Sequence, residues 1–287
     1  ATVASLPAAL AAPGPRDDTQ VLARVRGGRV RGQREQGVLV FRGLRYGADT
    51  AAHRFQPPRR EAAWRGIADA LEFGAAAPQG GSEGPGSEDC LFLNVWTPAL
   101  DARARRPVLV YIHGGGFNNG SGSDPLYDGS ALCRRGDVVV VTLNHRLNTF
   151  GYLYLGALGD PLYAASGNAG QLDLVQALQW VREHATTFGG DPGNITVFGQ
   201  SGGGAKIATL MAMPAARGLF QRAWTMSGQQ VTAAGPRAAA QRAALAMQTV
   251  GAADITALLR LPTADLPAAT RARDPSRAEG TALYFGP

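Results

Sequence analysis

A five-residue pattern in the second half of the chain, Gly199-Gln200-Ser201-Gly202-Gly203, constrains the fold more than any other stretch. The run Ile195–Phe198 before it is rich in apolar and β-branched residues, which predicts a buried strand. The run Ala205–Met213 after it suits a helix. A G-x-S-x-G pattern between a strand and a helix predicts a nucleophile elbow, although the bare pattern also occurs by chance in ordinary loops.

The elbow accounts for the spacing of its glycines. Ser201 must adopt a strained backbone conformation to raise its hydroxyl above the edge of the sheet. Gly199 and Gly203, two positions to either side, are small enough for the strand and the helix to pack together. Ser201 is therefore the candidate nucleophile.

A second glycine cluster, His113-Gly114-Gly115-Gly116-Phe117, directly follows the apolar run Val108–Ile112. Successive glycines let backbone N–H groups point into a cavity instead of into a strand ladder. In acyl transfer such groups bind the oxygen that becomes negative in the tetrahedral intermediate. Alone, the cluster fits an ordinary glycine-rich turn equally well; together with the elbow it predicts an oxyanion hole.

Strands and helices alternate along the chain, which predicts an α/β fold with a mostly parallel central sheet and helices on both faces. The 287 residues suffice for one large α/β domain or two smaller ones. The expected strands, two of them a hairpin at the edge, are Gly28–Arg31, Gly37–Phe41, Leu91–Trp96, Pro107–Ile112, Val138–Leu143 and Arg222–Met226. The expected helices, besides the one after the elbow, are Leu172–Phe188 and Pro236–Val250, the latter followed by Gly251.

Composition excludes several classes of function. The net charge of +6 comes from 28 basic and 22 acidic residues, but the arginines are scattered without interleaved aromatics, which favours a solvated surface over nucleic-acid binding. Cys90 and Cys133 cannot form a disulfide framework and lack metal-ligand spacing, so we expect two buried thiols. No ligand cluster indicates a metal or cofactor.

The first residues differ from the rest. Residues Ala1–Ala12 are apolar and too short to span a bilayer, and they contain Ala9-Leu10-Ala11, which resembles a signal-peptidase site. We interpret residues 1–20 as the remnant of an export signal or as a disordered arm. The first interpretation places the protein outside the cytoplasm, secreted or periplasmic; the second leaves it in the cytoplasm.

Seven motifs together resemble the type B carboxylesterases, the cholinesterase-like branch of the α/β-hydrolases, from about Gly28 to Pro287. The elbow and the glycine cluster are two of them. The others are Phe41-Arg42-Gly43-Leu44, Ser87-Glu88-Asp89-Cys90-Leu91-Phe92-Leu93-Asn94, Asn144-His145-Arg146-Leu147, Asn168-Ala169-Gly170-Gln171-Leu172-Asp173 and Phe188-Gly189-Gly190-Asp191-Pro192.

The resemblance assigns roles to individual residues. It implies that Ser201 is the nucleophile and that the backbone amides of Gly115, Gly116 and Gly202 form the oxyanion hole. It also implies that Glu88 and Arg146 form a salt bridge with a structural role. Domain 21–287 is then the N-terminal part of an α/β-hydrolase domain.

The chain departs from the family pattern near the elbow. Gln200 stands where the family usually has Glu, so a residue close to the reaction is neutral here. His145 and Asn148 replace a Tyr and a Gly of the family pattern. The cysteine that often pairs with the one at Cys90 corresponds to Ala77, so Cys90 is expected to be a free thiol.

The general base of a serine hydrolase is not evident in this chain. This fold takes its triad in the order serine, acid, histidine, and no histidine follows Ser201. Of the earlier histidines, we expect His113 to lead structurally into the glycine turn and His145 to be buried and satisfied, whereas His184 and His53 should be solvated.

The acidic residues after Ser201 are expected to be solvated or to cap helices, and not to complete the triad. They are Asp254, Asp265, Asp274 and Glu279. We therefore expect a complementary C-terminal polypeptide of the same gene product, as a separate chain or as residues beyond Pro287, to supply the acid and the histidine.

These features predict a serine carboxylic-ester hydrolase that acts on a small-molecule ester through an acyl-enzyme. A catalytically silent, cholinesterase-like adhesion or binding module is the main alternative. A thioesterase or an amidase with the same mechanism would share every residue named.

Overall fold

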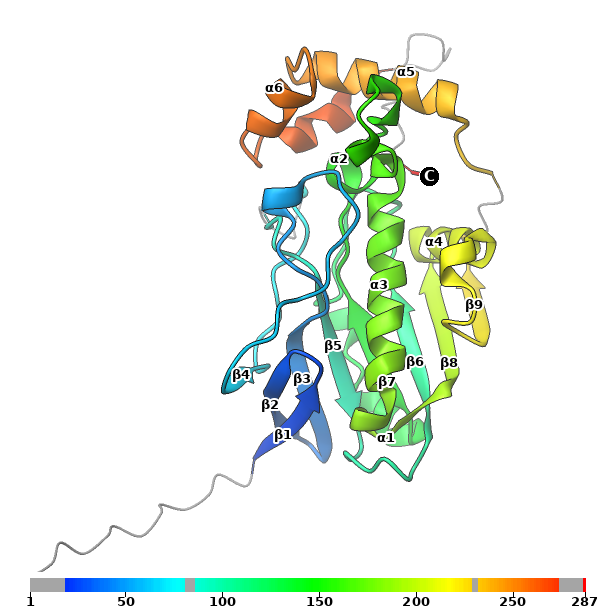
Figure 1. Cartoon of the computed structure of the whole chain (residues 1–287). Helices are drawn as coiled ribbons and strands as arrows, with labels where there is room; N and C mark the ends of the chain where they lie inside the picture. Colours follow the sequence, from blue (N-terminus) through cyan, green and yellow to red (C-terminus); the bar gives the residue numbers. More distant parts are fainter. Residues whose placement is uncertain (1–18, 81–85, 229–231, 274–285) are drawn as a thin grey trace, which may run out of the picture.

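The computed structural model describes residues 19–80, 86–228, 232–273 and 286–287. Nine strands form one sheet, and their order across it is β1-β2-β3-β5-β7-β6-β8-β9, with β4 paired to β2 (Figure 1). The strands are β1 (Gln20–Val25), β2 (Gly28–Glu35), β3 (Val38–Arg45), β4 (Ile67–Asp69), β5 (Phe92–Thr97), β6 (Arg106–Ile112), β7 (Val139–Leu143), β8 (Gly190–Gln200) and β9 (Arg222–Met226). The predicted α/β-hydrolase class is confirmed.

One half of the sheet is antiparallel, apart from the short strand β4, which pairs with β2 in parallel. β1, β2, β3 and β5 pair in sequence, and β5 joins β7 in the same antiparallel sense. The predicted hairpin is present as β2 and β3, both longer than expected. β1 was not expected; it begins at Gln20, where the sequence placed the end of the N-terminal arm.

The other half, from β7 to β9, is parallel. Every residue of β7 is buried, as its continuous apolar run predicts. β6 pairs with β8 so that Ile112 is opposite Gly199. The two strands thus end side by side, and the glycine turn and the elbow emerge next to each other.

Helices cover both faces of this sheet. On one face, α3 (Ala169–His184) and α4 (Gly202–Ala212) pack over the main apolar core, which includes Val139 and Val141 (Figure 1). On the opposite face, α1 (Ser130–Gly136) contributes Cys133 to a smaller cluster with Val138 and Val140. Alternate residues of one strand therefore reach two separate cores.

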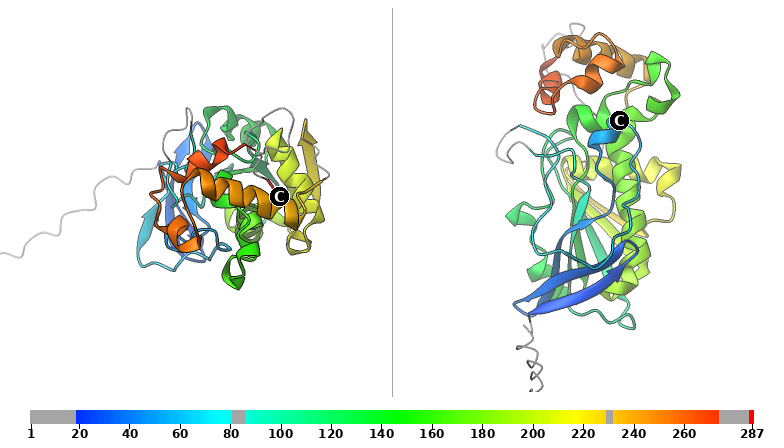
Figure 2. Two further views of the ribbon diagram at one scale, coloured as in Figure 1. Left: turned by 90° about the horizontal axis from the view of Figure 1, so that it is seen from above. Right: turned by 60° about the vertical axis from the view of Figure 1, so that its left-hand side comes forward.

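Helices from the last part of the chain lie over the carboxyl ends of the parallel strands, β6 to β9 (Figure 2). Here α2 (Asn148–Tyr152), α5 (Pro236–Thr249), α6 (Ile255–Arg260) and the 3₁₀ helix η8 (Leu266–Arg271) share an apolar cluster. The predicted helix with proline near its start is α5, and Gly251 follows it at φ +69°. We call α5, α6 and η8, with the segments that join them, the upper layer.

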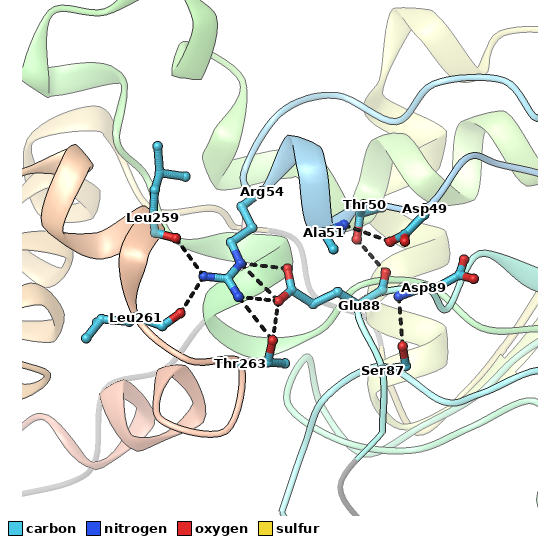
Figure 3. Close-up of polar contacts among 10 residues, drawn as sticks. All are labelled: Asp49, Thr50, Ala51, Arg54, Ser87, Glu88, Asp89, Leu259, Leu261 and Thr263. Atoms are coloured by element: carbon cyan, nitrogen blue, oxygen red, sulfur yellow. Dashed lines mark hydrogen bonds and ion pairs between the residues drawn. The ribbon is translucent and has the colours of Figure 1, made fainter.

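The expected salt bridge between Glu88 and Arg146 is wrong, because each residue has another partner. Arg54 donates from Nε to Glu88 at 2.8 Å and also reaches the carbonyl oxygens of Leu259 and Leu261 in the upper layer (Figure 3). Arg146 is fully buried and donates from Nη2 to Asp173 of α3 at 2.6 Å. Sequence motifs place these charges near one another but do not say which pair up.

Two further expectations concern cysteines and membranes. Cys90 and Cys133 are free thiols, and burial raises the pKa of both, that of Cys133 to about 11. Among the described residues, no helix is long and apolar enough to cross a bilayer. The expected export remnant lies outside the described residues.

Candidate active site

Ser201 occupies the tight turn between β8 and α4. Its backbone has φ 52° and ψ −122°, a conformation that costs free energy for a residue with a side chain. Its N–H donates to the carbonyl oxygen of Met226 at the end of β9, at 2.8 Å. A neighbouring strand thus holds the strained residue in place.

The glycines of the elbow are required by close packing. A Cβ atom on Gly199 would lie 2.6 Å from the carbonyl oxygen of Ile112, and one on Gly203 would lie 2.0 Å from the same oxygen. The end of β6 therefore passes directly against the elbow. Side chains at either glycine would force β6 and α4 apart.

The glycine turn after β6 has the backbone freedom that the sequence suggests. Gly115 and Gly116 both have positive φ, +80° and +59°. The N–H groups of Asn118 and Asn119 donate to the carbonyl oxygen of Gly115 at 3.2 and 3.3 Å, which closes the turn. Other residues would adopt these φ values only under strain.

Gly202 touches this turn. A Cβ atom on Gly202 would lie 2.2 Å from the carbonyl oxygen of Gly116 and 2.5 Å from its backbone nitrogen. The structure therefore brings Gly115, Gly116 and Gly202 together beside Ser201. Gly202 is also the first residue of α4, where helical N–H groups are free to bind an anion.

Gln200 is exposed and borders the same site. A Cβ atom on Gly114 would lie 3.0 Å from the carbonyl oxygen of Gln200 and 3.4 Å from its Oε1. Gln200 also lines a cavity of about 460 Å³ with Tyr111, Tyr127 and Phe198. The residue is thus placed to affect whatever approaches the elbow, without adding charge.

His113 and His145 are buried and stack with their ring centroids 4.9 Å apart. The Nδ1 atom of each ring lies within 2.9 Å of the carbonyl oxygen of the following residue. Burial lowers the pKa of both, that of His113 to about 3, so the rings are neutral and donate from Nδ1. His145 is buried as expected but only half satisfied, because among the described residues its Nε2, like that of His113, has no hydrogen-bond partner.

The remaining histidine interpretations are partly wrong. His184 was expected to be solvated, but it is buried on α3 against Trp180, because the helix turns that face toward the sheet. Its Nε2 accepts from the N–H of Arg26 at 3.4 Å. His53 is half-buried in a short 3₁₀ helix.

The acids after Ser201 that lie in the described part of the chain have the expected local roles. Asp254 caps α6, with its Oδ1 accepting from the N–H of Ala257 at 2.7 Å. Asp265 is exposed just before η8. Asp274 and Glu279 lie outside the described residues. The described residues also contain no cluster of His, Cys, Asp and Glu that could hold a metal.

One residue of the site escaped sequence analysis. Lys206 is completely buried in α4, and its Nζ donates to the carbonyl oxygen of His113 at 3.0 Å. Burial lowers the pKa of Lys206 to about 7. The residue type could have revealed it, because Lys206 is the only lysine in the sequence.

Comparison with known proteins agrees with this geometry. The carboxylesterase family matches residues 17–274. The chain is 45% identical over 233 residues to the para-nitrobenzyl esterase of Bacillus subtilis (strain 168), covering 78% of this chain and 47% of that protein. It is 42% identical over 217 residues to the phenmedipham hydrolase of Pseudarthrobacter oxydans, covering 71% of this chain and 42% of that protein.

Solved structures give the same result. The crystal structure of a Geobacillus stearothermophilus carboxylesterase matches with a TM-score of 0.85 and 42% identity, over 93% of this chain and 55% of that one. The chain thus belongs to the carboxylesterase family, as the motifs indicated. It spans about half the length of the relatives it matches.

Proposed function

We propose that this chain carries the nucleophile and the oxyanion hole of a serine carboxylic-ester hydrolase. Ser201 Oγ attacks the ester carbonyl, the alcohol leaves, and water releases the acid from the acyl-enzyme. The packing of Gly202 against Gly116, beside the strained Ser201, is the observation that carries this proposal. It brings the backbones of two separate segments into close contact, which supports a shared set of N–H donors.

Electrostatics supports the same assignment. The tetrahedral intermediate bears a negative oxygen, and the amides of Gly115, Gly116 and Gly202 are the donors proposed to bind it. α4 begins at Gly202, so the positive end of its helix dipole adds to those donors. The neighbouring residue Gln200 adds no opposing negative charge.

The acid and the histidine of the triad are proposed to come from a complementary C-terminal polypeptide of the same gene product. Residue order supports this, because no histidine follows Ser201 in the sequence, and the two stacked histidines before it, His113 and His145, are neutral and bonded to backbone. Without a base, a serine hydroxyl is weakly nucleophilic at neutral pH.

The substrate is proposed to be a small-molecule ester. Relatives named para-nitrobenzyl esterase and phenmedipham hydrolase support this class. Export to the periplasm or the medium also remains a proposal, which rests on the sequence of the first residues.

A fluorophosphonate probe tests the reaction class. The full-length protein should be labelled covalently at Ser201, and Ser201→Ala should abolish the labelling. A matched control is Ser227→Ala, which removes a hydroxyl at another positive-φ serine, φ 53°, after β9. An unlabelled but folded wild-type protein would favour the alternative, a silent binding module.

A further inference from the structure

Lys206 is unusual in this sequence by its type alone. It is the only lysine, and all the other basic residues among the 28 are arginines. It is also completely buried, whereas lysine almost always keeps its ammonium group in water. A chain that uses arginine everywhere else therefore places its one lysine in the interior, five residues after Ser201.

Neither a surface role nor an ion pair explains this position. In the part of the chain that the structure describes, no carboxylate lies within ion-pair distance of Nζ, so its charge has no counterion there. Lys206 lies close enough to the stacked imidazoles of His113 and His145 to lower the pKa of both, and both are neutral, whereas burial lowers its own pKa. A buried group without a counterion is costly, which calls for an explanation.

The contacts of Lys206 lie at the two ends of the glycine turn. Before the turn, Nζ donates to the carbonyl oxygen of His113 at 3.0 Å. After the turn, Nζ faces the ring of Phe117, 5.7 Å from its centroid, in a cation–π arrangement. One side chain from α4 thus contacts both residues that flank Gly114, Gly115 and Gly116.

We propose that Lys206 is a positioning residue, whose side-chain amine fixes the turn Gly114–Gly116 in the conformation that binds the negative oxygen. This rests on the proposed ester hydrolysis. The three glycines restrict their own backbone little, so the turn needs support from outside. Lys206 gives that support from the same helix that carries Gly202, so α4 holds both the turn and Gly202.

The choice of lysine over arginine fits this role. An arginine keeps its charge at any pH, whereas a buried lysine can lose its proton. Burial lowers the pKa of Lys206 to about 7, and the amine donates to the His113 carbonyl in either state. The turn is therefore held by a hydrogen-bond donor that can lose its charge, which limits the free-energy cost of burying it.

The first test compares Lys206→Met, which keeps the size but removes the donor, with Lys206→Gln, which keeps a donor, in the full-length protein. Rates are expressed per fluorophosphonate-reactive site. The Met variant should lose kcat by on the order of 10², as for one lost oxyanion donor, with KM changed less than about threefold. The Gln variant should recover part of that loss. The control Ile207→Val, at the next buried position of α4, should leave kcat unchanged.

A purely structural role predicts another pattern. It would lower the melting temperature of Lys206→Met and the number of reactive sites, while each remaining site kept its rate. That result would overturn the proposal. A wild-type protein that fluorophosphonate does not label, or a Ser201→Ala variant with full activity, would instead overturn the proposed function.

A second measurement needs no variant. Phenylboronic acid forms a tetrahedral, negatively charged adduct on a catalytic serine, with an oxygen among the oxyanion donors. In ¹⁵N-lysine NMR, the lysine signal that titrates near pH 7 should move to a higher pKa when the adduct forms, because the nearby negative charge favours the ammonium form. An unchanged titration would overturn the proposal.

Discussion

Arg54 holds Glu88 and the upper layer at the same time: its guanidinium donates to the Glu88 carboxylate at 2.8 Å and to the carbonyl oxygen of Leu261 at 2.6 Å. The side chains of Arg54 and Glu88 are largely buried, with exposed fractions of 11% and 3%. Thr263 of the same layer also donates to Glu88. The ion pair between Arg54 and Glu88 thus connects the upper layer to the segment that leads into β5.

Arg54→Met should therefore destabilise the fold, by about 3 kcal/mol, because it leaves the Glu88 carboxylate buried without its cation. Urea unfolding would measure the change. Arg105→Met is a matched control, since it breaks an exposed pair with Asp191 and should leave the midpoint where it is. Equal effects of the two substitutions would contradict the role given to Arg54.

Ser201→Ala should reduce kcat by roughly six orders of magnitude, as in other serine hydrolases. The fold should persist, because alanine removes only the hydroxyl. Steady-state kinetics on an activated ester, with circular dichroism as the check on folding, provides the measurement. A purified variant that keeps more than about a hundredth of the activity would exclude Ser201 as the nucleophile.

Gly115→Val should disturb the oxyanion donors and lower kcat by on the order of 10²–10³ for each donor lost. A side chain there would meet Asn119 at 2.2 Å, at a φ of +80°. Gly66→Val, at φ +82° with open space around it, imposes similar backbone strain far from Ser201. If both variants keep the wild-type kcat, the glycines serve only the turn.

Gln200→Glu should move the acidic limb of the pH–rate profile to higher pH. A carboxylate beside the elbow would stabilise the protonated form of a nearby catalytic imidazole and raise its pKa. The base must be neutral to accept the serine proton, so activity would then begin at higher pH. A limb that stays in place or moves down would show that Gln200 does not lie near the base.

Lys206→Met should change stability in a pH-dependent way. In the folded state burial lowers the pKa of Lys206 to about 7, whereas in the unfolded chain it is about 10.4. Between pH 7 and pH 10 the unfolded chain binds one proton more than the folded protein, so the stability of the fold rises with pH. Below pH 7 the folded protein bears the full free-energy cost of burying the charged amine. The Met variant avoids that cost.

The gain for Lys206→Met should be on the order of a few kcal/mol below pH 7 and shrink as the pH rises toward 10. Urea unfolding at pH 6 and pH 9 would measure it. A gain that is equal at both values, or larger at pH 9, would show that folding does not lower the pKa of Lys206.

The elbow could be predicted from sequence because its causes are local. Gly199, Ser201 and Gly203 meet requirements set by the adjoining strand and helix, and the structure has both. The strands of the parallel half were equally evident, since burial on both faces leaves continuous apolar runs such as β7.

The ion pairs and Lys206 could not be predicted in the same way. The partners of Glu88 and Arg146 come from distant segments, and only the packed fold decides between nearby charges. Lys206 falls in a helix whose sequence does not show that its lysine points beneath the end of β6. β1 was not predicted because Leu22, an apolar residue on its exposed face, interrupts the alternation of apolar and polar residues, although burial does alternate along the strand.

The pairing of Ile112 with Gly199 has a consequence for how such a protein can diversify. The spacing between the nucleophile and the turn opposite it is set by hydrogen bonds between two strands, not by loop length. Insertions or substitutions in the upper layer can therefore change which substrates reach the site without changing the distance between the nucleophile and the glycine turn. A one-residue shift of β8 against β6 would have the opposite effect. It would leave the upper layer unchanged but would move Ser201 away from the glycine turn.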